Sequence, residues 1–240
     1  MVNAFVKYIF LTFYFVIFFL NSYSQEVKLA SKEYPELRYY PLRGSVYTNT
    51  YIQIKGDAYL TDDWITGNLY LTYDRTISNV KFKYDNYGQF VVVYNDKLHR
   101  LVLPEHNLIT AFSYKDGGVN RYFKRVNSDF GVKKVHSDYF LEVLHEGNIS
   151  FYKLFLKSTL PLRIPEMPFI DEFISEERYY IYLNGNYEIV HLKKSFLKQR
   201  FPQYKKEISH YARTNKLKLK READFAKMIA YLGQLSNLVE

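Results

Sequence analysis

Histidine is the residue type in this sequence best suited to bind a metal ion or to move protons near neutral pH, and the chain has six of them. His145 and Glu146 begin the His-Glu-x-x-His pattern with which a helix of a metalloprotease binds zinc. Ile149 stands where the second histidine belongs, so the pattern is incomplete. The remaining histidines have no ligand spacing: His99, His106, His136, His191 and His210. Since the chain also has no cysteine, we expect no metal site.

Paired carboxylates have a chemistry of their own, because a glycosidase needs two acids that flank the bond it cleaves. Three adjacent pairs occur in expected turns or loops: Asp62-Asp63, Asp171-Glu172 and Glu176-Glu177. Neighbouring residues of a strand would in any case point to opposite faces. The sequence also has no Gly-x-Ser-x-Gly elbow, phosphate-binding glycine loop or EF-hand. We therefore expect no catalytic residues, no cofactor and no enzymatic activity.

A basic segment, residues 193–221, has a strong excess of positive charge. It holds eleven Lys or Arg and one acid, Glu207, which gives a local charge of +10. Such a patch attracts an anionic lipid headgroup at a peripheral membrane contact, an acidic glycan or an acidic envelope protein. Nucleic acid is not expected, since the aromatic-basic interleaving of single-strand binders is not localised here. The candidate contact residues are Lys205, Lys206, Arg213, Lys216, Lys218, Lys220 and Arg221. A merely solvated polar face is the alternative.

Two apolar features are also candidates for contact. Trp64, the one tryptophan, follows the turn Asp62-Asp63, and it is either a ligand platform or a core anchor. Residues 158–178 are proline-rich and are expected as an insertion between strands. This insertion either covers an open end of the sheet or acts as a lid or partner-binding arm. Its candidate contact residues are Met167, Phe169, Ile170 and Phe173.

Alternation of apolar and polar residues predicts many short antiparallel strands. They are expected at residues 46–54, 69–74, 80–85, 90–94, 99–103, 108–114, 121–126, 140–144, 149–156, 179–183 and 187–192. Turn residues separate nearly all of them, and Asn184-Gly185 predicts a two-residue type I′ hairpin. The spacing favours an antiparallel meander that forms a curved sheet, a sandwich or a barrel.

Beyond Leu192 the apolar residues recur every three or four positions, which predicts helices at residues 194–201, 203–213 and 221–235. Between the last two, Lys216-Leu-Lys-Leu-Lys220 alternates like a short strand or an extended link. We therefore expect a mainly β protein, α+β by content, with C-terminal α-helices.

Residues 1–24 have the features of a secretory signal peptide. Lys7 precedes an apolar run, Tyr8–Leu20, that is shorter than the roughly 20 residues needed to span a bilayer. Ser22 and Ser24 give the small-residue spacing that signal peptidase accepts before Gln25. An uncleaved N-terminal anchor is the alternative. The expected organisation is a signal peptide at 1–24, a linker at 25–42, a β domain at 43–192 with the insertion 158–178, and a basic helical region at 193–240.

The run Gly56–Leu71, the tripeptide Lys83-Tyr-Asp85, residues 139–144 and the helical end resemble uncharacterised exported proteins of Bacteroidota. The resemblance implies a periplasmic or cell-envelope location and no particular activity. With the basic segment, it favours a non-catalytic binding or scaffold protein of the periplasm or outer-membrane periphery. The alternative is a periplasmic carrier that holds an apolar or glycan ligand on a curved aromatic sheet, which a deep apolar cavity would favour.

Overall fold

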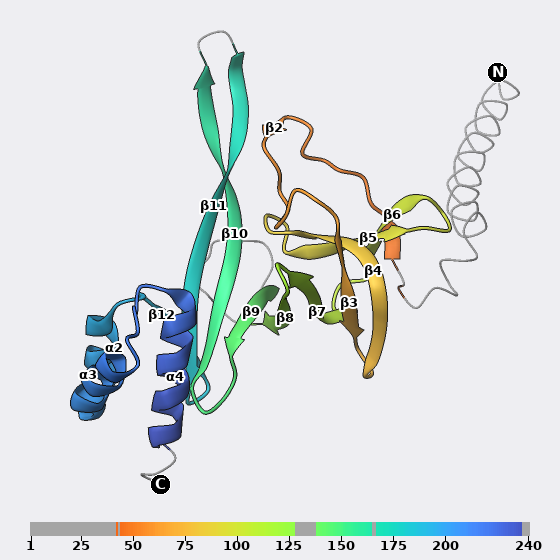
Figure 1. Ribbon diagram of the computed structural model, residues 1–240. Helices are drawn as coiled ribbons and strands as arrows, with labels where there is room; N and C mark the ends of the chain where they lie inside the picture. The colour runs from red at the N-terminus through yellow and green to blue at the C-terminus, as the bar shows by residue number, and fades with distance from the viewer. Residues whose placement is uncertain (1–41, 43, 128–137, 165–166, 237–240) are drawn as a thin grey trace, which may run out of the picture. The chain divides into compact units, whose positions relative to one another are not determined.

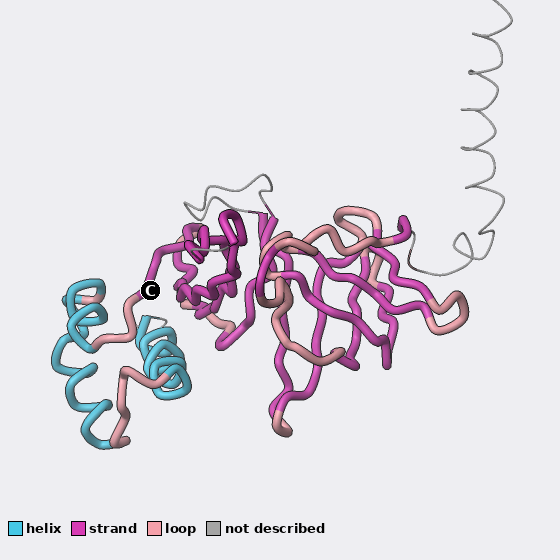
Figure 2. Tube along the Cα trace, turned by 90° about the horizontal axis from the view of Figure 1, so that it is seen from above, coloured by secondary structure: helices cyan, strands magenta, loops and turns pink. Residues whose placement is uncertain are grey.

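The computed structural model describes residues 42, 44–127, 138–164 and 167–236. The expected signal peptide and most of the expected linker lie outside these residues. The chain divides into two units, residues 1–44 and 45–240, and the β region and the C-terminal helices belong to the same unit. The protein is mainly β, with a curved, open and mostly antiparallel sheet of twelve strands and C-terminal helices (Figures 1 and 2). The expected fold class is therefore confirmed, as an open sheet.

The described strands follow the predicted alternation closely from residue 65 onward. Their bounds are β1 (Gly44–Val46), β2 (Ile54–Lys55), β3 (Ile65–Leu71), β4 (Arg75–Asp85), β5 (Phe90–Asn95), β6 (Arg100–Pro104), β7 (Ile109–Asp116), β8 (Val119–Asn127), β9 (Asp138–His145), β10 (Ser150–Ile164), β11 (Met167–Leu183) and β12 (Asn186–Val190). The strand expected at residues 46–54 is wrong. Only its ends are strand, and β2 pairs in parallel with β11.

Strand order explains why the sheet curves. The order is β1-β6-β5-β4-β3-β7-β8-β9-β10-β11-β12, so three strands separate β6 from β7 in the sheet. Four strand spacings measure about 19 Å along a sheet, whereas the link 105–108 reaches about 17 Å when fully extended. The link also contains a turn, in which the Leu108 N–H donates to the Glu105 carbonyl at 3.1 Å. The sheet must therefore bend until the end of β6 comes back toward β7.

Gly67 lets β3 pair closely with β7 at the centre of this bend. A Cβ at Gly67 would lie 2.1 Å from the Ser113 carbonyl oxygen, so a larger residue would push the two strands apart. The register of β3 also shifts between Gly67 and Leu69 in its pairing with β4. Such irregularities increase the local twist of a sheet.

Buried aromatic rings fill the concave side of the curved sheet. Tyr84 on β4 and Phe140 on β9 are four strands apart in sheet order, yet their ring centroids lie 5.5 Å apart. Phe112 stacks on Phe123 at 4.5 Å and lies 5.4 Å from Phe82. All five side chains are fully buried. Rings from distant strands meet only where the sheet curves toward them, so this cluster is the core of the β region.

The proline-rich segment 158–178 is not the insertion that the sequence predicts. It forms the distal half of a long hairpin in which β10 and β11 pair from Ser150 opposite Tyr182 to Ile164 opposite Met167. Pro161 lies opposite Asp171 within this ladder. In a ribbon of two strands, every second N–H points away from the partner strand, so proline can occupy such positions. The predicted Asn184-Gly185 turn is confirmed, because both residues have the positive φ of a type I′ turn, 51° and 82°.

Three helices pack on one face of the hairpin. They are α2 (Lys194–Arg200), α3 (Lys205–Thr214) and α4 (Glu222–Ser236), with the short 3₁₀ helix η2 (Pro202–Tyr204) between the first two (Figure 1). Their apolar side chains, among them Leu197, Ile208 and Phe225, form one buried cluster with Phe151 and Ile181 of the hairpin. The predicted helices are confirmed. No helix in the described part of the chain is both long and apolar enough to cross a membrane.

Candidate anion-binding site

The link between α3 and α4 folds back because of the way α3 ends. The Leu217 N–H donates to the Ala212 carbonyl at 2.9 Å and the Lys216 N–H to the Arg213 carbonyl at 3.2 Å, the hydrogen bonds of a Schellman motif. Lys216 takes the left-handed position that glycine usually fills, with φ 52°. Residues 216–220 thus form neither a strand nor a fully extended link, because turns lie at residues 215–216 and 219–220 and the Arg221 N–H donates to the Lys218 carbonyl at 2.7 Å. The leucines of this link join the helical core, and its lysines are exposed.

This link, the end of α3 and the start of α2 surround an open hollow of about 590 Å³, here called the basic hollow. Ala212, Leu217 and Leu219 supply apolar lining. Its polar lining residues are Lys193, Lys194, Ser195, Arg213 and Lys220. Four cationic side chains and one hydroxyl from three segments therefore converge on one depression.

Three acids near the helical region are already engaged with other groups, whereas Glu207 has a buried Oε2 with no hydrogen-bond partner among the described residues. Glu188 makes a two-pronged ion pair with Arg200, with N–O distances of 2.6 and 2.7 Å. Glu222 lies 3.1 Å from the Lys153 ammonium group, and Asp224 accepts the Lys218 backbone N–H at 2.9 Å. Of the eleven basic residues at 193–221, only Arg200 forms an ion pair with a described carboxylate. The four cations of the hollow have no such partner within the described ranges.

The structure brings some of the predicted contact residues together and separates others. Arg213 and Lys220 line the hollow, while Lys216, Lys218 and Arg221 are exposed on or next to the same link. Lys205 and Lys206 lie in the first turn of α3, about 12 Å along the helix axis from Arg213. The sequence prediction missed Lys193, Lys194 and Ser195 as members of a site. Their position in the same basic segment was the available signal, but their approach to Arg213 depends on helix packing.

Trp64 is neither a core anchor nor an open platform. Its half-buried ring meets Tyr94 edge to face at 5.8 Å, and the ammonium groups of Lys81 and Lys83 lie 5.6 and 5.8 Å from the ring centroid. These lysines alternate with the core residues of β4, so the tryptophan lies on the other face of that strand.

Of the four expected lid residues, the structure describes the side chain of Phe173 but only the backbone of the other three. Phe173 is half-buried between Tyr51 and Tyr87, with ring centroid distances of 5.6 and 5.3 Å. It therefore anchors the hairpin to its own chain and is not a contact on a free lid. The backbones of Met167, Phe169 and Ile170 belong to β11, and their side chains lie outside the described part.

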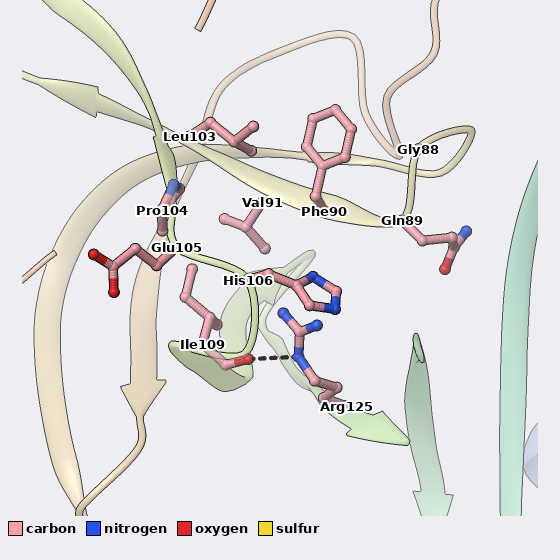
Figure 3. Close-up of a pocket in the computed structure, with 10 residues that line it drawn as sticks. All are labelled: Gly88, Gln89, Phe90, Val91, Leu103, Pro104, Glu105, His106, Ile109 and Arg125. Atoms are coloured by element: carbon pink, nitrogen blue, oxygen red, sulfur yellow. Dashed lines mark hydrogen bonds between the residues drawn. The ribbon is translucent and has the colours of Figure 1, made fainter. Parts of the chain in front are cut away.

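A second cavity lies where the end of β6 returns toward β7 and β8, and it is here called the seam pocket (Figure 3). It measures about 330 Å³ and is lined by residues of the turn before β5, of β5, β6, the link 105–108, β7 and β8. The Arg125 side chain enters from β8, and its Nε donates to the Ile109 carbonyl at 2.8 Å. His106 Nε2 and Arg125 Nη1 both face Asp138 Oδ2, at 3.1 and 3.4 Å. Burial lowers the pKa of Arg125, since it disfavours the charged guanidinium.

The seam pocket is a constellation that the sequence did not predict. A histidine oriented by a carboxylate is the pair that activates a nucleophile in many hydrolases. Among the described residues that line this pocket, there is no serine, threonine or cysteine to receive that activation. Among the described residues there is also no group of three or more His, Asp or Glu that could hold a metal ion.

Comparisons of the chain with protein-family models, with curated proteins and with solved structures find no match. The two cavities and the chemistry of the residues that line them are therefore the features that bear on function.

Proposed function

We propose that this protein is a non-catalytic binding or scaffold component of the cell envelope, which contacts an anionic partner through its basic helical region. The basic hollow carries the proposal. Lys193, Lys194, Arg213 and Lys220 meet there with no carboxylate of the described chain beside them. Like charges gathered in one depression repel one another, and an external anion relieves that repulsion.

The rest of the chain supports an envelope location for this partner. The apolar run Tyr8–Leu20, with Lys7 before it and Ser22 and Ser24 after it, has the pattern of an export signal. The resemblance to exported proteins of Bacteroidota favours the same compartment. Anionic lipid headgroups, acidic glycans and acidic envelope proteins are the anions that a periplasmic protein meets. Each lysine or arginine near an anionic membrane surface contributes about 1 kcal/mol of binding free energy.

The filled concave face argues against the alternative of a carrier with its ligand under the aromatic sheet. Phe82, Tyr84, Phe112, Phe123 and Phe140 occupy that space and have no exposed surface. A ligand there would have to displace core side chains. The helical region, in contrast, offers an open depression with its charges already in place.

Flotation of the purified protein with lipid vesicles tests the proposal. We expect residues 25–240 to float with vesicles that contain phosphatidylglycerol and not with pure phosphatidylcholine, and added salt should weaken the association. A variant with Lys193, Lys194, Arg213 and Lys220 changed to glutamine should lose at least tenfold in affinity, since four contacts of about 1 kcal/mol are removed.

The matched control removes the same charge elsewhere, at Lys55, Arg75, Lys97 and Lys115, which are all exposed. Equal losses in the two variants would show that net charge alone matters, and the hollow would not be the site. An acidic polysaccharide such as polygalacturonate, offered in place of vesicles, distinguishes a glycan from a lipid. Binding to neither, with no acidic protein crosslinked in native envelopes, would contradict the proposal.

A further inference from the structure

The seam pocket is lined by the cationic side chain of Arg125, and the described residues do not use all of its hydrogen-bond donors. An arginine side chain has five N–H groups. In Arg125, the Nε–H is used by the Ile109 carbonyl and one Nη1–H by Asp138, so three N–H groups have no acceptor among the described residues. Only 15% of this side chain is exposed to solvent. A hydrogen-bond acceptor stabilises a charged group this deep in the protein more than it stabilises an arginine on the surface.

Arg125 is also held in place before any ligand arrives. Its guanidinium lies 4.7 Å from the Phe140 ring centroid, and the Ile109 carbonyl and the Asp138 carboxylate fix its orientation. In Figure 3 the guanidinium and the His106 ring point toward each other across one end of the pocket. A planar guanidinium that is already oriented matches the two oxygens of a carboxylate.

The other walls of the pocket are apolar. Val91, Leu103 and Ile109 line it with Phe90 and Pro104. Its volume, about 330 Å³, lies at the small end of the range of natural ligand pockets, about 300–1,000 Å³. The Gln89 side chain faces away, because its amide donates to the carbonyls of Asn86 and Phe155. The cavity therefore combines one polar end with a short apolar chamber.

We propose that the seam pocket binds a small carboxylic acid with a short apolar tail. The carboxylate accepts hydrogen bonds from the Arg125 N–H groups that have no acceptor in the described part of the chain, and the tail lies against Val91, Leu103 and Ile109. Such a site is independent of the basic hollow, which attracts a larger anion from outside. The protein would thus bind a small metabolite beside its envelope partner, without chemistry on either.

His106 lies at the polar end of the pocket. Its Nε2 is 3.1 Å from Asp138 Oδ2, and the Glu105 carboxylate points away from the pocket (Figure 3). The acidic side chain of Glu105 therefore does not face the position of the ligand carboxylate.

Isothermal titration of residues 25–240 with hexanoate tests the proposal, with 1-hexanol as the uncharged probe. We expect hexanoate to bind at least tenfold more tightly than hexanol, and affinity to rise about fourfold per methylene from butanoate to hexanoate. Arg125→Gln should lose at least tenfold, while Arg75→Gln, an exposed arginine of β4, should bind as the parent does.

Loss of the Arg125 contacts risks the fold itself, so the comparison of hexanoate with hexanol on the parent protein is the second measurement, which needs no variant. Equal binding of hexanol and hexanoate by the parent, or binding of neither, would overturn the proposal. Neither result depends on the basic hollow, so a failure of this proposal is distinguishable from a failure of the proposed function.

Discussion

Replacing Phe112 with alanine tests whether the concave face is a packed core or a space that a ligand could enter. The ring is fully buried and lies 4.5 Å from Phe123, 5.2 Å from Tyr84, 5.2 Å from Phe140 and 5.4 Å from Phe82. Removal of a buried phenyl group from a core that cannot collapse costs about 3–5 kcal/mol. Since domains are stable by about 5–15 kcal/mol, this single change would remove a large share of the stability.

Urea unfolding followed by tyrosine fluorescence and circular dichroism measures that loss as a shift of the midpoint at constant slope. Phe112→Leu should lose less, since it keeps part of the volume. Tyr73→Ala is the surface control, because Tyr73 is 92% exposed, and it should change stability by less than about 0.5 kcal/mol. A loss below about 1.5 kcal/mol for Phe112→Ala would refute the packed core, and the carrier reading would then regain its support.

Two further predictions concern the helical region. Lys216→Gly should stabilise the protein by about 1 kcal/mol in the same unfolding assay, because Lys216 has a φ of 52° that glycine adopts without a Cβ clash; a loss of stability would show that the lysine side chain makes an important contact. The ion pair with Arg200 lowers the pKa of Glu188, chiefly through the hydrogen bond between the two side chains. The ion pair therefore stabilises the fold at pH values above the ordinary glutamate pKa of about 4.3. This stabilisation is lost as the pH falls through the lower pKa that Glu188 has in the folded state. Glu188→Gln should therefore cost a few tenths of a kcal/mol at pH 7, since both groups are partly exposed, and nothing near pH 2; an equal cost at both pH values would contradict the ion-pair explanation.

Local sequence patterns predicted those parts of the fold that depend on neighbours in the chain. Three local patterns predicted the structure correctly. They are the alternation in Val80–Asp85, the Asn184-Gly185 turn and the spacing of three and four residues beyond Leu192. The proline-rich segment is a strand although proline disfavours an interior strand, because at Pro161 β10 pairs only with β11 among the described strands, so its outer edge needs no N–H donor there.

The candidate sites were only partly predictable. The basic segment was visible as a run of charge, but the hollow also needs the Schellman turn at Lys216 to carry Lys220 back toward Lys193. No local sequence pattern indicates the seam pocket. His106, Arg125 and Asp138 come from three separate elements, and only the curvature of the sheet brings the first of them to the other two.

The strand order also has a consequence for how the chain folds. In the described sheet, pairing between strands distant in sequence is confined to β3 with β7, β1 with β6 and β2 with β11, so every other ladder closes a short loop. Because loop closure costs more entropy for distant segments, two local meanders, β3–β6 and β7–β12, should form first and then join. If the pairing of β3 with β7 forms after the main folding barrier, substitutions of paired residues such as Gly67 and Tyr114 should alter the unfolding rate more than the folding rate.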